Sequence, residues 1–163
     1  MSANKYLPHL LVIPEDDANR DIVTGFRNHH SVKSWQIQVE NVAGGWKKAA
    51  DTFVEEYAKP MKEKFEMRHV LILIDFDERE NRFEYVRNMI PEDLRNRVFI
   101  MGCQDEPERV RAATGLTKEK LGEALAEACA SGTDGLWANE ILVHNRPELQ
   151  RMRETICRHL LES

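Results

Sequence analysis

The sequence lacks any long hydrophobic run. No apolar stretch approaches the roughly 20 residues that a transmembrane helix needs, so we expect no membrane partner. Residues 1–6 also lack the apolar core of a secretory signal peptide. We therefore expect a cytoplasmic protein.

Cysteine is scarce, and its spacing is that of neither a disulfide framework nor a zinc site. The chain has three cysteines, Cys103, Cys129 and Cys157, which lie far apart and include no CxxC pair. Cys129 and Cys157 fall on the apolar faces of predicted helices. We expect both to be buried, reduced thiols.

An excess of positive charge is also missing. The 23 basic and 28 acidic residues give a net charge of −5, which argues against a protein that coats nucleic acid non-specifically. An enzyme that binds nucleic acid through a metal and a local basic patch remains compatible with this charge.

The length of 163 residues is that of one domain with its own hydrophobic core. We predict a single domain over 1–163, with 114–163 as a helical carboxy-terminal extension.

Apolar strands alternate with amphipathic helices along the chain. The pattern predicts strands over residues 7–13, 35–42, 68–75 and 97–101. It predicts helices over residues 17–29, 46–65, 83–90, 107–113, 117–129 and 147–161. This alternation indicates an α/β fold, a Rossmann-like three-layer sandwich with a mostly parallel four-stranded sheet followed by carboxy-terminal helices.

The most informative stretch is an unbroken apolar run from Val70 to Ile74, followed by Asp75 and Asp77. Such a run is typical of a strand buried on both faces. At a period of two, the two aspartates leave the strand on the same side. Because paired carboxylates repel one another unless a cation lies between them, the pair predicts a site for a hard cation such as Mg²⁺. The alternative is a strand that ends in an acidic, solvated loop.

Two other predicted strands also end in residues that suit a binding site. Glu15 follows the first strand, and Gly44 and Gly45 follow the second. The carboxyl ends of parallel strands lie on one edge of the sheet, where ligands bind. We therefore expect a carboxylate, a flexible glycine turn and a carboxylate pair around one cleft.

This order of features resembles the Toprim domain, the catalytic domain of topoisomerases, bacterial primases and OLD-type nucleases. The resemblance covers residues 7–105 and is nearest to OLD-type and small stand-alone members. It implies hydrolysis of phosphodiester bonds in DNA or RNA with Mg²⁺ or Mn²⁺. It also implies that Glu15 acts as general acid/base or metal ligand, and that Asp75 and Asp77 hold the metal. OLD-type domains work beside an ATPase, so an ATPase partner is also implied.

The chain departs from the family pattern at three positions. Asp16 stands where a glycine often follows the glutamate, which places more negative charge in the site. Asn19 stands where many members have an aspartate. Arg79 stands where a longer acidic series would have its third acid, and it can instead contact a phosphate.

Several weaker candidates surround this pattern. Glu108 follows the fourth strand and is either a second-metal ligand or part of a solvated helix start. Lys47 and Arg82 are candidates for phosphate contact, whereas Trp46 and Trp137 fit core or interface positions better than base-stacking ones. A homodimer is also possible.

Two other functions stay open. The fold can serve as a non-catalytic binding or assembly partner, which the small size and the acidic charge favour. A phosphotransferase of the haloacid dehalogenase type also begins its motif with Asp-x-Asp after a strand. That motif continues to threonine or valine where this chain has Arg79, and it usually lies on the first strand.

Overall fold

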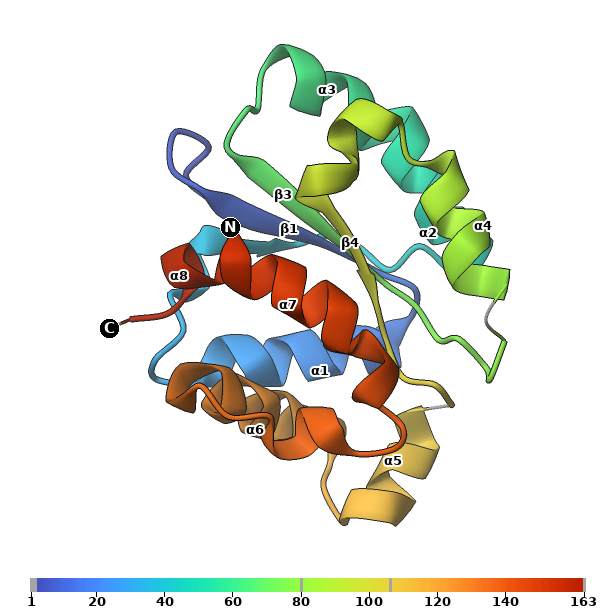
Figure 1. Cartoon of the computed structure of the whole chain (residues 1–163), viewed down its shortest axis with the longest axis vertical. Helices are drawn as coiled ribbons and strands as arrows, with labels where there is room; N and C mark the ends of the chain where they lie inside the picture. The colour runs from blue at the N-terminus through green and yellow to red at the C-terminus, as the bar shows by residue number, and fades with distance from the viewer. Residues whose placement is uncertain (1–2, 80, 106, 163) are drawn as a thin grey trace.

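The computed structural model describes residues 3–79, 81–105 and 107–162, and it is built on a parallel four-stranded sheet (Figure 1). The strands are β1 (His9–Pro14), β2 (Ile37–Val39), β3 (Arg68–Leu73) and β4 (Val98–Met101), in the order β2-β1-β3-β4. The predicted α/β fold with a parallel sheet is therefore confirmed. β1 and β3 pair along their whole length and form the centre of the sheet.

Helices cover both faces of the sheet. Their bounds are α1 (Asp17–Asn28), α2 (Trp46–Thr52), α3 (Ala58–Glu63), α4 (Asn81–Met89), α5 (Pro107–Thr114), α6 (Lys118–Ser131), α7 (Arg146–Glu154) and α8 (Cys157–Leu160). Short 3₁₀ turns occupy Ser34–Gln36, Glu92–Arg97, Gly135–Ala138 and Val143–Asn145. Within the described part of the chain, no helix is both long and apolar enough to cross a bilayer.

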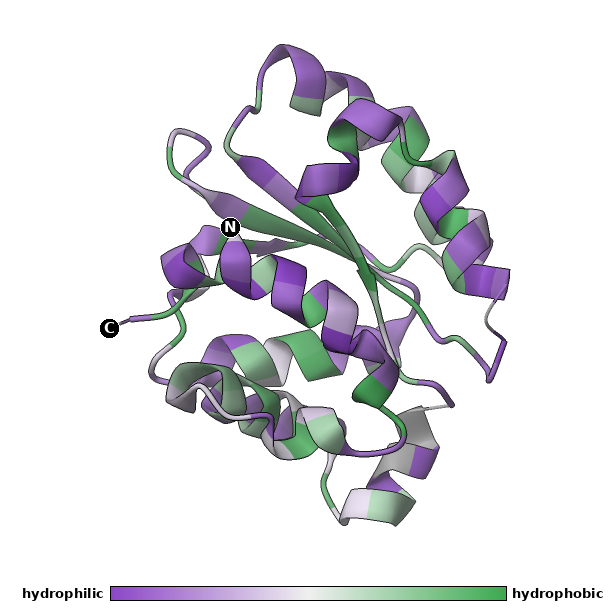
Figure 2. Ribbon diagram, viewed as in Figure 1, coloured by the Kyte–Doolittle hydropathy of each residue, from purple (hydrophilic) through white to green (hydrophobic). Residues whose placement is uncertain are grey.

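The alternation of side chains along β1 divides the core into two halves. Leu11 and Ile13 pack with residues of α2, α3 and α4, whereas Leu10 and Val12 pack with residues of α1 and α6 to α8. Successive residues of a strand point to opposite faces, so a strand covered on both faces must be apolar throughout. Figure 2 shows these hydrophobic strands between helices that carry many hydrophilic residues.

Two predicted helices are interrupted. The helix expected over 46–65 contains a π-helical turn at Phe53–Tyr57, just before Pro60. Proline lacks an N–H group and its ring clashes with the carbonyl four residues earlier, which disturbs the regular hydrogen-bond ladder. The helix expected over 147–161 is divided at Thr155, whose hydroxyl donates to the carbonyl of Arg151 at 2.8 Å. The second strand is also shorter than predicted.

The carboxy-terminal helices pack directly on the rest of the fold. α6 meets α1 at two glycines: a Cβ atom on Gly25 would lie 1.9 Å from the carbonyl oxygen of Glu119, and one on Gly122 would lie 2.0 Å from that of Ile22. A larger side chain at either position would push the helices apart. These helices therefore share one core with the sheet.

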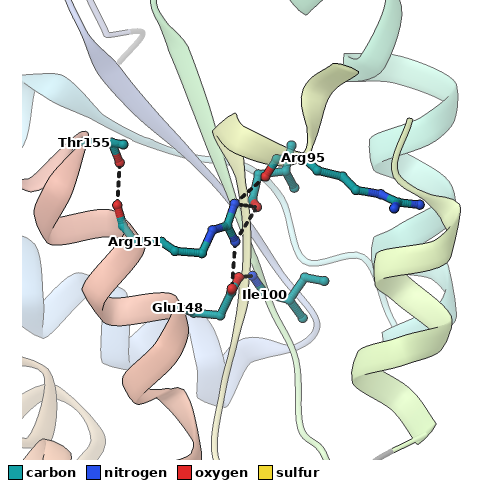
Figure 3. A network of polar contacts seen from close by, with 6 residues as sticks. Arg95, Ile100, Glu148, Arg151 and Thr155 are labelled. Atoms are coloured by element: carbon teal, nitrogen blue, oxygen red, sulfur yellow. Dashed lines mark hydrogen bonds and ion pairs between the residues drawn. The ribbon is translucent and has the colours of Figure 1, made fainter. Parts of the chain in front are cut away.

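α7 covers the open edge of β4 (Figure 3). Glu148 accepts the N–H of Ile100 at 2.9 Å, and Asn145 accepts the N–H of Gly102 at 3.1 Å. Arg151 contacts Glu148 at 2.6 Å and donates to backbone carbonyls of the same segment. Glu148 and Arg151 are three residues apart on one face of α7, and Asn145 directly precedes this helix. Together they replace the hydrogen bonds of a missing fifth strand.

Candidate metal-binding site

The site lies where β1 and β3 end side by side. Pro14 and Leu73 are paired in the sheet, so the residues that follow them emerge next to each other. The N–H of Glu15 donates to the carbonyl of Leu73 at 2.9 Å. The Glu15 carboxylate in turn accepts the N–H of Asp75 at 2.7 Å. These two bonds fix the Glu15 side chain beside the end of β3, as the strand-end argument predicts.

Three carboxylates meet at this point. Glu15, Asp16 and Asp75 each contribute an oxygen atom, and these atoms lie within 4.8 Å of one another. All three residues are half-buried. Around a Mg²⁺ ion, neighbouring oxygen ligands lie about 3 Å apart and opposite ones about 4.2 Å apart, so the three oxygens would have to move closer together to hold one divalent cation. We call these residues the carboxylate cluster.

Asp16 has a second role as the cap of α1. Its Oδ1 accepts the backbone N–H of Asn19 at 2.9 Å, which satisfies a donor that the first helical turn leaves without a partner. The same oxygen accepts the Asn19 side-chain amide at 2.9 Å, and that amide also donates to Asp75 at 3.2 Å. The cap thus holds Asp16 beside Asp75.

Asn19 supports the carboxylate cluster through its side-chain NH2 group, which donates to Asp16 and Asp75. The residue is fully buried, yet its Oδ1 has no hydrogen-bonding partner among the described residues. A buried carbonyl oxygen without a partner is costly. This oxygen is on the opposite side of the amide from the NH2 group that contacts Asp16 and Asp75.

The environment favours a proton or a metal ion on Glu15. Burial raises the pKa of its carboxyl group most, and the neighbouring Asp16 raises it further. The N–H of Asp75 and the guanidinium of Arg82 oppose this rise. The raised pKa means that the Glu15 charge lacks full compensation from the protein alone.

Asp77 lies outside the carboxylate cluster. Asp77 and Glu78 both adopt left-handed backbone conformations, with φ of 51° and 55°, so the period-two geometry ends after Phe76. The Asp77 carboxylate lies 3.6 Å from Arg82 and 3.9 Å from Arg79. Two consecutive non-glycine residues in this region are unusual and costly. Metal binding by Asp77 stays a prediction.

Arg82 contacts both Asp75 of the carboxylate cluster and Asp77 outside it. Its Nη1 donates to the carbonyl of Asp75 at 2.6 Å, and its side chain is largely buried, with 15% exposed. Arg79 is exposed, with 66% of its side chain accessible. Both predicted phosphate-binding arginines therefore lie beside the end of β3.

The glycine turn, Gly44 and Gly45, lies next to Glu15 of the carboxylate cluster. The N–H of Gly44 donates to the carbonyl of Glu15 at 2.9 Å. Gly44 has a φ of 87° and Gly45 a φ of 159°, as expected for backbone that favours glycine. Lys47, the second residue of α2, is exposed. The side chain of Glu108 in α5 is outside the described residues, so its predicted role stays a prediction.

The sequence analysis placed the charge of Asp16 in the site, but it assigned metal binding to neither Asp16 nor Asn19. The signal for Asp16 was its position directly after Glu15, at a helix start. Comparison with protein-family models, with curated proteins and with solved structures found no match. What the geometry establishes is an α/β fold with an acidic group that can hold a divalent ion.

Proposed function

We propose that this protein hydrolyses phosphodiester bonds of nucleic acid with the help of Mg²⁺ or Mn²⁺, in the manner of a Toprim nuclease. One observation carries the proposal: three carboxylate oxygens within 4.8 Å of one another, at the carboxyl edge of a parallel sheet, where such folds bind ligands. Oxygen ligands of this kind suit Mg²⁺ and Mn²⁺.

The residues of the site fit distinct roles. Asp16 and Asp75 would hold the cation together with Glu15. A bound cation would supply a nucleophilic hydroxide and neutralise charge at the leaving oxygen. Glu15 is also the best candidate for moving a proton, because its raised pKa lies nearer the working pH of an acid/base catalyst.

Cationic side chains beside the cluster would receive the substrate. Arg82 donates to the carbonyl of Asp75, Arg79 lies 3.9 Å from Asp77, and Lys47 lies near the start of α2, after the glycine turn. All three would contact phosphate oxygens. They also offset the repulsion between a nucleic acid and a chain of net charge −5.

Metal binding is the first test. Isothermal calorimetry with Mg²⁺ and Mn²⁺ should show binding by the wild type that Asp75→Asn abolishes. Asp17→Asn is the matched control, because Asp17 neighbours Asp16 but pairs with Arg20 and is 75% exposed. Asp77→Asn should have a weaker effect than Asp75→Asn, since Asp77 lies outside the cluster. Equal metal binding by the wild type and Asp75→Asn would overturn the site.

Cleavage is the second test. Single- and double-stranded DNA and RNA are incubated with the protein and Mn²⁺ or Mg²⁺. Glu15→Gln should bind nucleic acid but lose cleavage, because glutamine keeps the acceptor for the Asp75 N–H and cannot take up a proton. Cleavage that survives in Glu15→Gln would remove the assigned proton-transfer role.

A non-catalytic binding or assembly partner is the second candidate. Its supporting observation is the position of Asp77, which is engaged with Arg82 at 3.6 Å rather than with the other acids. Metal binding without cleavage of any of the four substrates would favour this candidate. The next measurement would then be capture of an ATPase partner by the tagged protein, together with its oligomeric state by light scattering.

A further inference from the structure

Two aromatic rings and two cations gather on the surface between α2 and α4. The rings of Trp46 and Tyr85 meet edge to face with centroids 5.2 Å apart. The Lys47 ammonium lies 5.4 Å from each ring centroid. The Arg82 guanidinium lies 5.1 Å from the Trp46 centroid. We call these four residues the aromatic patch.

The aromatic patch is fixed on one side and open on the other. Trp46 is partly buried and packs against the hydrophobic core under α2 and α4, which holds the orientation of its ring. Tyr85 is 43% exposed, so part of its ring is accessible from solvent. A rigid ring next to an accessible one suits stacking by a flat ligand, because little side-chain entropy is lost on binding.

The aromatic patch adjoins the carboxylate cluster. Arg82 belongs to the patch and donates to the carbonyl of Asp75 at 2.6 Å. On the other side, Trp46 follows the glycine turn whose Gly44 N–H donates to the carbonyl of Glu15 at 2.9 Å. A ligand on the patch would therefore lie next to the carboxylates.

We propose that the aromatic patch stacks an unpaired nucleobase of a single-stranded nucleic acid and so selects the substrate of the neighbouring site. This inference rests on the proposed function. Every nucleobase has a π-face that aromatic side chains can stack on, without regard to sequence. In a duplex those faces are covered by neighbouring base pairs, so only a base outside the stack can use the patch.

Lys47 moves from the rings to the phosphate backbone when the base binds. Its ammonium is exposed, and a cation–π contact at an exposed site is weaker than base–aromatic stacking. A base therefore displaces it at a small cost. The released ammonium then pairs with a phosphate, while Arg82 keeps its place beside Asp75.

Fluorescence anisotropy tests this inference without any cleavage. Labelled single-stranded oligonucleotides of about 12 residues, within the usual range of single-strand site sizes, are titrated with protein at low salt in EDTA. Oligo-dT and oligo-U distinguish DNA from RNA, and a blunt duplex of the same length is the reference. Single strands should bind more tightly than the duplex.

The variants assign that preference to the aromatic patch. Trp46→Ala and Tyr85→Ala should each weaken single-strand binding about tenfold, which corresponds to about 1.4 kcal/mol. Trp46→Phe should keep most of the affinity. Trp35→Ala is the matched control, because Trp35 is 55% exposed but lies beside the start of β2, at the amino end of the sheet. Circular dichroism melting checks that each variant is folded.

Unchanged single-strand affinity in folded Tyr85→Ala and Trp46→Phe/Tyr85→Ala variants would overturn the inference, as would tighter binding of the duplex. The calorimetric metal titration reports on the proposed function separately. Tyr85-dependent single-strand binding by a protein that binds no metal would reject the nuclease and keep the aromatic patch. Metal-dependent cleavage that is indifferent to Tyr85→Ala would reject the patch and keep the nuclease.

Discussion

Replacing Asp16 with asparagine tests whether the carboxylate cluster is built to hold a cation. The substitution removes one charge and keeps the shape of the side chain. Asparagine also keeps the oxygen that accepts the backbone N–H of Asn19, and the two residues are about equally good helix caps. Any change in stability therefore reports on charge.

The distances set the size of the effect. At separations of at most 4.8 Å, each pair of carboxylates repels by at least about 0.9 kcal/mol even at the dielectric constant of water, and by about 3.5 kcal/mol at an effective value near 20. Asp16 takes part in two such pairs. Loss of its favourable interaction with the α1 dipole costs about 0.3–1 kcal/mol. The repulsion is larger, so without metal the Asp16→Asn protein should be more stable by about 1 kcal/mol or more.

Thermal unfolding at about pH 8, where carboxylates are ionised, measures this difference. In EDTA the variant should melt at least about 2–4 °C above the wild type, given the usual scaling for a domain of this size. In Mn²⁺ at a hundred times the wild-type Kd, the wild type should gain about 2.7 kcal/mol and the variant much less. In Mn²⁺ the melting temperature of Asp16→Asn should therefore no longer exceed that of the wild type by this margin, and it should equal it or fall below it.

Asp17→Asn is the control, because Asp17 also lies at the start of α1 but is exposed and outside the cluster. It should not be stabilised in EDTA. If the wild type and Asp16→Asn melt at the same temperature in EDTA and gain equally from Mn²⁺, the reasoning is wrong. The three carboxylates would then be a solvated acidic turn.

Two further predictions concern the rest of the fold. Glu148→Ala should lower the free energy of unfolding by about 3 kcal/mol in urea titrations, because it leaves the buried N–H of Ile100 without its acceptor and removes the partner of Arg151. Burial lowers the pKa of His69 to about 4, so the unfolded chain takes up a proton between about pH 6.5 and pH 4 that the folded chain does not. The free energy of unfolding should therefore fall as the pH drops through that range, and the fall should be smaller in His69→Phe.

Control variants test the Glu148 and His69 predictions separately. Glu154→Ala, on the exposed side of the same helix, should change stability by less than about 0.5 kcal/mol, and Glu148→Gln should cost less than Glu148→Ala because it retains an acceptor. A stability cost for Glu148→Ala no larger than for Glu154→Ala would contradict the proposed role of α7 at the sheet edge. Identical pH dependence in the wild type and His69→Phe would show that other groups, such as the buried His9, dominate the acid response.

The strands and the edge that carries the site could be predicted from the sequence. The unbroken apolar run before Asp75 requires burial on both faces, and a chain that alternates such strands with amphipathic helices forms a parallel sheet. The carboxyl ends of all parallel strands share one edge of the sheet, so Glu15 and Asp75 were expected at the same edge. Only the strand order β2-β1-β3-β4 made β1 and β3 neighbours and brought the two residues together. The glycine pair was expected to permit a positive φ, since glycine has no Cβ, and Gly44 adopts one.

Only the tertiary structure decided which acids join the cluster. Asp77 lies two residues beyond Asp75, as the pattern of a metal pair requires, but its backbone turns left-handed and the following Glu78 N–H donates to the carbonyl of Gln104 at 2.6 Å. Asp16 takes a place in the cluster because it caps α1 at the end of β1. The meeting of Trp46 with Tyr85 likewise depends on how α2 packs against α4.

The local sequence determines which residues form a strand and where the strand ends, because the side-chain pattern of a strand depends only on residues adjacent in the chain. The direction of a side chain beyond a strand end depends on one or two backbone angles and on distant hydrogen bonds, which only the assembled fold supplies.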